Sequence, residues 1–443
     1  MNFIMKSVRP IGRSILSFSS GYYLAVMLII LFFDALFIFV HFTNWNIGWG
    51  AVGVNAPGFN GGFGDFRYIL QKATCLKGNE LPYAQVQSCQ QIPWNYPWLW
   101  IPLVDGLGFT LADANIIGVL LAGAFFIFAL SLLKKSSAVE GLCVGLALMS
   151  PPVMLAIERA NIDLIMFMMI VTACHIGTSQ KDSGRTFLSS FLILAAAFLK
   201  LYPIFALIPL WLESTLKKQR VVLILCAALF GFYCLWTYND IMNGMAQTPK
   251  MTFVSYGVNV LPEILFENTP YKNTVLSHRG FIQIFLGTVI FSCGYFISRY
   301  LYERIARAQG DVTPESAFKM RCFRAGSAIF MGSYFLLGNN WHYRLIFLIL
   351  CFPQAFAWSR MQDKIQRRQG IGFIVLLVLT FWLSYLSSQM YFTDRVMVLG
   401  FALVCFNHVI NLALSLAFAC RLFVDLRDWI QMLVRPKEDR SPS

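Results

Sequence analysis

The sequence consists largely of apolar stretches of about 20 residues, and short clusters of basic residues separate many of them. A helix of this length crosses the hydrocarbon core of a bilayer, which is about 30 Å thick. Only helices and closed barrels satisfy their backbone hydrogen bonds within lipid. The pattern therefore predicts an all-α polytopic integral membrane protein with spans at 21–42, 112–133, 138–157, 161–178, 221–238, 280–298, 325–341, 344–359, 371–389 and 396–419.

The composition agrees with a single transmembrane domain over residues 1–443. Hydrophobic residues make up 57% of the chain and charged residues only 13%, whereas soluble domains carry about 25% charged residues. The net charge is +13, but the basic residues form short clusters between apolar segments. Because no continuous basic face results, we expect the lipid bilayer and no nucleic acid as a partner.

Basic residues also predict the orientation, since loops rich in Lys and Arg stay in the cytoplasm. The stretch 187–213 has basic residues on both flanks and is interrupted by Lys200 and Pro203. A single span does not return to its starting side, so we expect a short hairpin with its tip near Lys200. This gives about 12 membrane-crossing segments, cytoplasmic termini and 25 of the 35 Lys and Arg residues inside.

On this topology the long loops, 43–111 and 239–279, lie outside, and the basic tail 420–443 is cytoplasmic. The short inner loops contain no phosphate-binding glycine loop, so we expect no soluble nucleotide site. We therefore predict an inner (plasma) membrane protein whose active site faces the periplasm or exterior. No Cys or His spacing is typical of a metal site, and we expect no metal or cofactor. A disulfide between Cys75 and Cys89 is left open.

The first outer loop contains the main catalytic candidate, Asp65. A predicted amphipathic helix runs from Asp65 to Leu76, and its apolar face suits the bilayer surface. Asp is a preferred N-cap residue, so Asp65 is interpreted either as a helix cap or as a catalytic carboxylate. The apolar face consists of Phe66, Ile69, Leu70 and Ala73.

Asp34 is the second candidate carboxylate. It lies inside the first span, about 12 Å before its outer end, where a lone charge costs roughly 2.5–3.5 kcal/mol. We therefore expect its side chain to face the bundle interior or a cavity. A structural role and a catalytic role both remain open.

Further polar residues gather at the predicted outer ends of spans. A cation at the headgroup level suits a lipid phosphate, so Lys200, Arg159, Arg344 and His342 are predicted to bind the phosphate of a lipid donor. Lys200 otherwise reaches the headgroups by snorkelling, and Arg159 otherwise neutralises its neighbour Glu158. The candidates for binding an acceptor or sugar are Tyr68, Tyr96, Glu158, Asn161, Tyr202, Tyr256 and Asn259.

Four motifs occur in order on the predicted outer side: GDFRY…KGNELPY…NYPW, ERANIDLI, FLKLYPIFALIPL and NWHYRLIFLI. Together they resemble GT-C glycosyltransferases, in particular glycosyltransferase family 87, the polyprenol-phosphate-mannose-dependent mannosyltransferases. The resemblance covers roughly residues 20–360. This chain departs from the family by having Tyr96-Pro97-Trp98 where a double proline is commoner.

The resemblance implies a GT-C-like fold and transfer of a sugar from a polyprenyl-phosphate carrier to an acceptor glycan or glycolipid outside the cytoplasm. It also implies that Asp65 is the general base of a single displacement. A carrier or flippase for a lipid-linked saccharide is the alternative, although it favours two related halves and charges deep within several spans. An O-antigen polymerase or ligase is a third possibility, but it is expected to have its long loop late in the chain.

Overall fold

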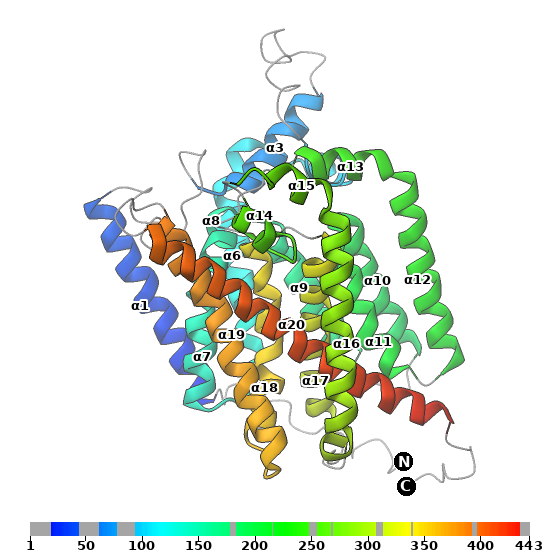
Figure 1. Ribbon diagram of the computed structural model, residues 1–443. Helices are drawn as coiled ribbons and strands as arrows, with labels where there is room; N and C mark the ends of the chain where they lie inside the picture. The colour runs from blue at the N-terminus through cyan, green and yellow to red at the C-terminus, as the bar shows by residue number, and fades with distance from the viewer. Residues whose placement is uncertain are drawn as a thin grey trace, which may run out of the picture.

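The computed structural model describes residues 19–43, 62–77, 94–177, 183–214, 216–247, 255–266, 269–306, 313–337, 340–391 and 397–434. These residues are almost entirely helical, which confirms the predicted all-α class (Figure 1). The two strands that they contain, β1 (Ser255–Tyr256) and β2 (Asn340–Trp341), pair antiparallel.

Five described helical segments are long and apolar enough to cross a membrane. A sixth results if α7 and α8, which meet at 52°, count as one broken span. The break falls at Pro151 and Pro152, where the missing proline N–H groups interrupt the helix. These helices fit the predicted membrane protein, and the count of 12 crossings stays a prediction. The segments are α1 (Ser20–Phe42), η2 (Leu111–Asp113) with α6 (Ala114–Ser131), α12 (Lys217–Trp236), α16 (Arg279–Ala306) and α20 (Met397–Val434), with α7 (Ala138–Leu148) and α8 (Pro151–Glu158) as the bent pair.

Other helices complete the core of the bundle. η6 runs through its centre, and all of its residues except Arg344 are buried. α17 and α19 pack around it, and α20 crosses the bundle obliquely in Figure 1. The core helices are α9 (Asp163–Ile176), α17 (Pro314–Gly332), η5 (Ser333–Leu337), η6 (His342–Cys351), α18 (Phe352–Ser359) and α19 (Lys364–Tyr391).

Small residues bring α1 and α7 into close contact. Gly21 and Ala25 on α1 face Gly141 and Gly145 on α7, which is the small-xxx-small pattern of membrane helix pairs. A side chain added at Gly141 would overlap the backbone carbonyl of Gly21, and one added at Gly21 would overlap that of Ser137. The two backbones therefore approach more closely than any larger residue permits.

Replacing Gly141 by leucine is expected to destabilise the protein, because the obstacle is backbone that cannot rotate away. Overpacking of this kind costs about 1–3 kcal/mol, so the melting temperature in detergent should fall. The matched control is Gly231→Leu on α12, where an added Cβ meets no atom within 4 Å. Equal melting temperatures for the two variants would contradict the tight helix crossing.

The segment 187–213 turns back on itself, as the sequence predicted. α10 (Ser183–Leu199) ends before Lys200, and η3 (Tyr202–Ala206) and α11 (Leu207–Glu213) lead back. Near one end of the segment, Ser189 Oγ donates to the carbonyl of Ala173 at 2.8 Å. Arg321 of α17 donates to the carbonyl of Cys174 at 3.0 Å and to the carboxylate of Glu213. Both ends of the hairpin therefore lie beside the same part of α9 and α17.

Segments that the predicted topology places in the cytoplasm meet at this end of the bundle. Arg321 and Arg324 both pair with Glu213, and Arg324 Nε also lies 2.9 Å from Asp425 of α20. Glu315, on the same helix as Arg321 and Arg324, pairs with Lys135. The base of the hairpin is thus tied to two other helices.

The two long loops share the opposite end. α3 (Gly64–Lys77), α13 (Tyr238–Gln247), α14 (Val260–Phe266) and α15 (Lys272–Ser277) gather at the top of Figure 1. α13 packs directly on the first loop, since a Cβ added to Gly244 would lie 3.5 Å from the Cα of Asn95. α5 (Trp100–Gly106) follows this segment and packs on α3.

Two expectations need correction. The apolar face of α3, formed by Phe66, Ile69, Leu70 and Ala73, is buried within the protein instead of lying on the bilayer, because α5 and α6 pack against it. Asp34 does not face the bundle interior: its side chain is exposed on α1, since the Gly21–Ala25 stripe turns the opposite face of the helix toward α7.

Candidate active site

The N-terminus of α3 docks on the turn between α8 and α9. The backbone N–H of Asp65 donates to the carbonyl of Arg159 at 3.1 Å, and that of Phe66 donates to the same oxygen at 3.3 Å. Between Arg159 and Asn161, Ala160 has a φ of 42°, a left-handed conformation that is uncommon for a residue with a Cβ. Such strain is often found at functional sites. Here it lets residues 159 and 161 both turn toward α3.

Both carboxylate oxygens of Asp65 are held by side chains of this turn. Arg159 Nη1 donates to Oδ1 at 2.8 Å, and Asn161 Nδ2 donates to Oδ2. Asp65 is not an N-cap, because α3 begins one residue earlier at Gly64. Its side chain remains 14% exposed, so the carboxylate is positioned and still accessible. Arg159, predicted to bind a phosphate, instead pairs with this carboxylate.

Asn161 connects Asp65 to Lys200 at the tip of the hairpin. While its Nδ2 donates to Asp65, its Oδ1 accepts from Lys200 Nζ at 3.3 Å. Lys200 also lies 2.7 Å from the carboxylate of Asp163, and the two side chains are 9% and 0% exposed. A single amide thus separates the carboxylate of Asp65 from a buried cation. Snorkelling of Lys200 is excluded by this burial.

Asp163 was not among the predicted site residues. It is the first residue of α9, and its buried carboxylate is the counter-ion that a buried lysine needs. The signal was present in the sequence, because Lys200 sits within an apolar hairpin and Asp163 begins the preceding apolar segment. Pairing the two requires the hairpin tip to lie at the level of the α8–α9 turn.

Aromatic rings surround the cations of the site. Lys200 Nζ lies 5.2 Å from the centroid of Tyr96 and 5.4 Å from that of Tyr343. Arg344 lies over Tyr202 at 4.9 Å. Such contacts stabilise a cation most when it is desolvated. Tyr343 was not among the predicted site residues, and its ring faces Lys200.

The β1–β2 pair attaches the second loop to the late motif. Ser255 is paired with Trp341, and Tyr256 with Asn340. Tyr256 is buried, donates or accepts a hydrogen bond with Ser333, and stacks on His342 at 6.4 Å. His342 itself is buried behind the site. Because His342 does not line the cavity described below, it does not lie among the residues that can contact a phosphate there.

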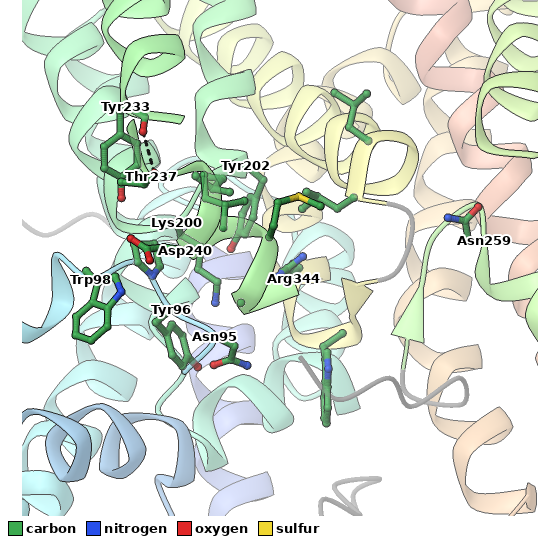
Figure 2. Close-up of a pocket in the computed structure, with 18 of the residues that line it drawn as sticks. Asn95, Tyr96, Trp98, Lys200, Tyr202, Tyr233, Thr237, Asp240, Asn259 and Arg344 are labelled. Carbon is green, nitrogen blue, oxygen red and sulfur yellow. Dashed lines mark hydrogen bonds between the residues drawn. The ribbon is translucent and has the colours of Figure 1, made fainter. Parts of the chain in front are cut away.

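A cavity of about 460 Å³ opens beside the hairpin tip (Figure 2). Tyr96, Lys200, Tyr202, Asn259 and Arg344, all predicted as site residues, line it. Figure 2 shows Lys200 and Arg344 below Tyr202, with Trp98 and Asp240 on one side of them and Asn259 far on the other. The remaining lining residues are Asn95, Pro97, Leu201, Tyr233, Thr237, Ile241, Met242, Gly244, Glu263, Arg279, Gln283, Leu336, Leu337 and Trp341.

Arg344 is the cation in this cavity without a carboxylate partner among the described residues. Lys200 pairs with Asp163, and Arg279 pairs with Glu263 at 2.7 Å. Arg344 donates to the neutral amide of Asn340, and its Nε is buried without a hydrogen-bond partner in the described part of the chain. A half-buried guanidinium whose buried Nε has no acceptor favours an anion.

Four other predicted residues surround Asp65 and do not line the cavity: Tyr68, Glu158, Arg159 and Asn161. Asp34 lies neither in this group nor in the cavity lining.

Within the described ranges, no cluster of three or more His, Cys, Asp and Glu side chains has the arrangement of a metal site. Cys75 is disulfide-bonded, and Cys89 lies outside the described residues.

A row of aromatic rings joins Asp65 to the cavity. Tyr68, one turn after Asp65 on α3, stacks on Trp94 at 5.9 Å, and Trp94 lies 6.1 Å from Trp98. Burial raises the pKa of Tyr68 to about 12, and the charge of Asp65 adds to the shift. The Tyr68 hydroxyl therefore stays protonated at neutral pH and remains a hydrogen-bond donor. Its oxygen is buried without a partner among the described residues.

The arrangement thus contains a positioned carboxylate, a bridging amide, a buried lysine, a half-buried arginine and an aromatic-walled cavity. Comparison with known proteins gives no relative: no protein-family model, no curated protein and no solved structure matches this chain.

Proposed function

We propose that this protein is a membrane glycosyltransferase that moves a sugar from a polyprenyl-phosphate carrier to an acceptor glycan or glycolipid. The observation that carries the proposal is the cavity at Lys200 and Arg344, one amide away from the carboxylate of Asp65. A phosphate anion matches the cations, and the carboxylate matches a hydroxyl nucleophile. The four motifs that resemble glycosyltransferase family 87 support the same activity.

The donor phosphate binds Arg344, which supplies unused N–H donors, and Lys200, which supplies an ammonium within the same cavity. Negative charge grows on the bridging phosphate oxygen as the bond to the sugar breaks. Fixed cations in a site of low dielectric stabilise that charge without reorganising. Asp163 holds Lys200 in place for this role.

Asp65 acts as general base on the acceptor hydroxyl. Arg159 and Asn161 fix the carboxylate, which takes the proton as the acceptor oxygen attacks the anomeric carbon. The new bond to the acceptor oxygen forms while the bond to the phosphate oxygen breaks, and its electron pair leaves with the lipid phosphate. A single displacement of this kind inverts the anomeric centre.

The apolar environment suits a lipid-borne donor. Leu336, Leu337 and Met242 line the same cavity as the two cations, so a prenyl chain finds apolar walls close to the phosphate. We assign the site to the periplasmic or exterior side of the inner membrane, within a GT-C-like bundle of about 12 crossings, because the two long loops with few basic residues share this end.

Replacing Arg344 by glutamine should weaken donor use by about ten- to a hundredfold in kcat/KM, since charged hydrogen bonds are worth about 1.5–3 kcal/mol. The assay incubates the purified protein with polyprenyl-phosphate sugars and measures released lipid phosphate. The matched control is Arg360→Gln at the opposite end of the bundle, where Arg360 pairs with Glu140. Full activity of Arg344→Gln with an unchanged apparent donor affinity would contradict the phosphate site.

The same assay separates the alternative functions. A carrier or flippase moves the intact lipid-linked saccharide and releases no lipid phosphate. A polymerase or ligase acts on polyprenyl-diphosphate donors, and it releases lipid diphosphate. Release of lipid monophosphate that depends on an added acceptor supports the transferase.

A further inference from the structure

Besides the cationic residues, Asn95, Trp98, Thr237 and Asp240 line the cavity, and none of these four belongs to the donor site proposed above. The Trp98 side chain is 43% exposed, and Asp240 is exposed beside it on the same side of Lys200 in Figure 2. A large aromatic ring and a carboxylate are thus both accessible at the mouth of the cavity.

Polar groups among these residues have unused hydrogen-bonding capacity. Asn95 Oδ1 is buried and has no hydrogen-bond partner among the described residues. The carboxylate of Asp240 on α13 has no ion-pair or hydrogen-bond partner within the described part of the chain. Most buried polar atoms in proteins are paired, so the Asn95 oxygen is suited to accept a hydrogen bond from a ligand in the cavity.

The wall that carries these groups is fixed by packing. Gly244 of α13 lies against Asn95: a Cβ added to this glycine would be only 3.5 Å from the Asn95 Cα. Trp98 contacts Trp94, which stacks on Tyr68 next to the base. The mouth of the cavity is therefore connected to Asp65 through a continuous row of rings.

Exposed aromatic rings combined with planar polar side chains suit a saccharide. The face of a tryptophan ring carries negative potential, which attracts the C–H face of a pyranose. Carboxylate and carboxamide groups accept or exchange two hydrogen bonds with neighbouring hydroxyls. A lipid chain would gain nothing from Asp240, and a tryptophan that merely anchors the protein at the interface needs no carboxylate beside it.

We propose that Asn95, Trp98 and Asp240 form a saccharide-binding subsite for the acceptor. This inference rests on the proposed transferase function and names its acceptor as a sugar residue stacked on Trp98. The position at the open mouth fits an acceptor that arrives from water, while the lipid-borne donor binds at Lys200 and Arg344.

Saccharide binding is measured without the donor. Saturation-transfer NMR is recorded on the full-length protein in nanodiscs with millimolar methyl glycosides of mannose, glucose, galactose and N-acetylglucosamine. At least one glycoside should bind. Trp98→Leu should weaken its binding by about two- to tenfold, the range given by one aromatic stacking contact. Asp240→Asn should weaken it by about ten- to a hundredfold, because it removes a charged acceptor.

The matched control is Trp236→Leu, since Trp236 at the end of α12 is 78% exposed and does not line the cavity. This variant should bind as the wild type does. Absence of binding by all four glycosides overturns the subsite, and so does unchanged binding in both Trp98→Leu and Asp240→Asn. Asp240→Asn alters an exposed group of equal size, so it tests the subsite even where Trp98→Leu fails to fold.

Failure of the transferase function gives a different result. If glycosides bind and depend on Trp98 while no polyprenyl-phosphate donor is cleaved, the saccharide subsite stands and the proposed reaction is wrong. If donors are cleaved equally well by the wild type and both variants at limiting acceptor, the reaction stands and the subsite is wrong.

Discussion

Replacing Asp65 by asparagine is expected to lower the rate of sugar transfer at least about a hundredfold, because general base catalysis contributes about 10²–10⁴-fold. Asparagine has the size of aspartate and keeps an oxygen that accepts from Arg159 or Asn161, but it does not take up a proton. Binding of the donor should change little, whereas the melting temperature should fall, because Arg159 loses the carboxylate with which it pairs. The measurements are initial rates at saturating donor and thermal unfolding in detergent.

Two other carboxylates serve as controls for this result. Asp113→Asn alters a half-buried residue just before α6, which accepts hydrogen bonds from Thr110 and does not line the cavity, and it should leave the rate unchanged. Asp34→Asn should lose far less activity than Asp65→Asn, since Asp34 is exposed on α1. An Asp65→Asn enzyme within a fewfold of the wild type, together with a folded but inactive Asp34→Asn enzyme, would reverse the assignment.

The largest expected effect on stability comes from Asp163→Asn. This change leaves the ammonium of Lys200 buried at 7% exposure without its counter-ion. Removing one partner of a buried ion pair costs about 3–5 kcal/mol, so thermal unfolding in detergent should occur at a clearly lower temperature. Lys200→Met should be destabilising for the same reason, because it leaves the carboxylate of Asp163 unpaired.

The double variant Asp163→Asn with Lys200→Met separates stability from activity. It removes both charges together, and replacing a buried pair by neutral groups is often neutral or stabilising. We expect a melting temperature near that of the wild type and a loss of donor turnover like that of Lys200→Met. A double variant as unstable as the sum of the single variants would show that the two side chains do not interact.

Charge and periodicity were sufficient to predict much of the arrangement. The basic flanks of 187–213 predicted the hairpin. The polar motifs predicted that Asp65, Asn161, Lys200 and Arg344 share one end of the bundle, where the first three form a chain of hydrogen bonds and the last two line one cavity. These predictions rest on two rules that are read from short stretches of sequence. Basic loops stay in the cytoplasm, and a lone charge within the bilayer is energetically costly.

Features that depend on packing between distant segments were not predictable. The apolar face of α3 looks equally suited to lipid and to protein, and only the position of α5 and α6 decides between them. For Asp34, the expected inward orientation failed because the glycine stripe of α1 lies on another side of the helix. The pairing of Asp163 with Lys200 requires the hairpin tip to lie at the level of the α8–α9 turn, and the sequence does not give that height.

The burial of Lys200 against Asp163 also bears on how the chain enters the membrane. Asp163 begins α9, and Lys200 follows it at the tip of the next hairpin. During synthesis the carboxylate is therefore already available when the lysine leaves the ribosome. Inserting a lone lysine costs roughly 2.5–3.5 kcal/mol, and a waiting counter-ion reduces that cost. The order of these two residues along the chain thus favours insertion of the hairpin next to α9, whose carboxylate neutralises the lysine.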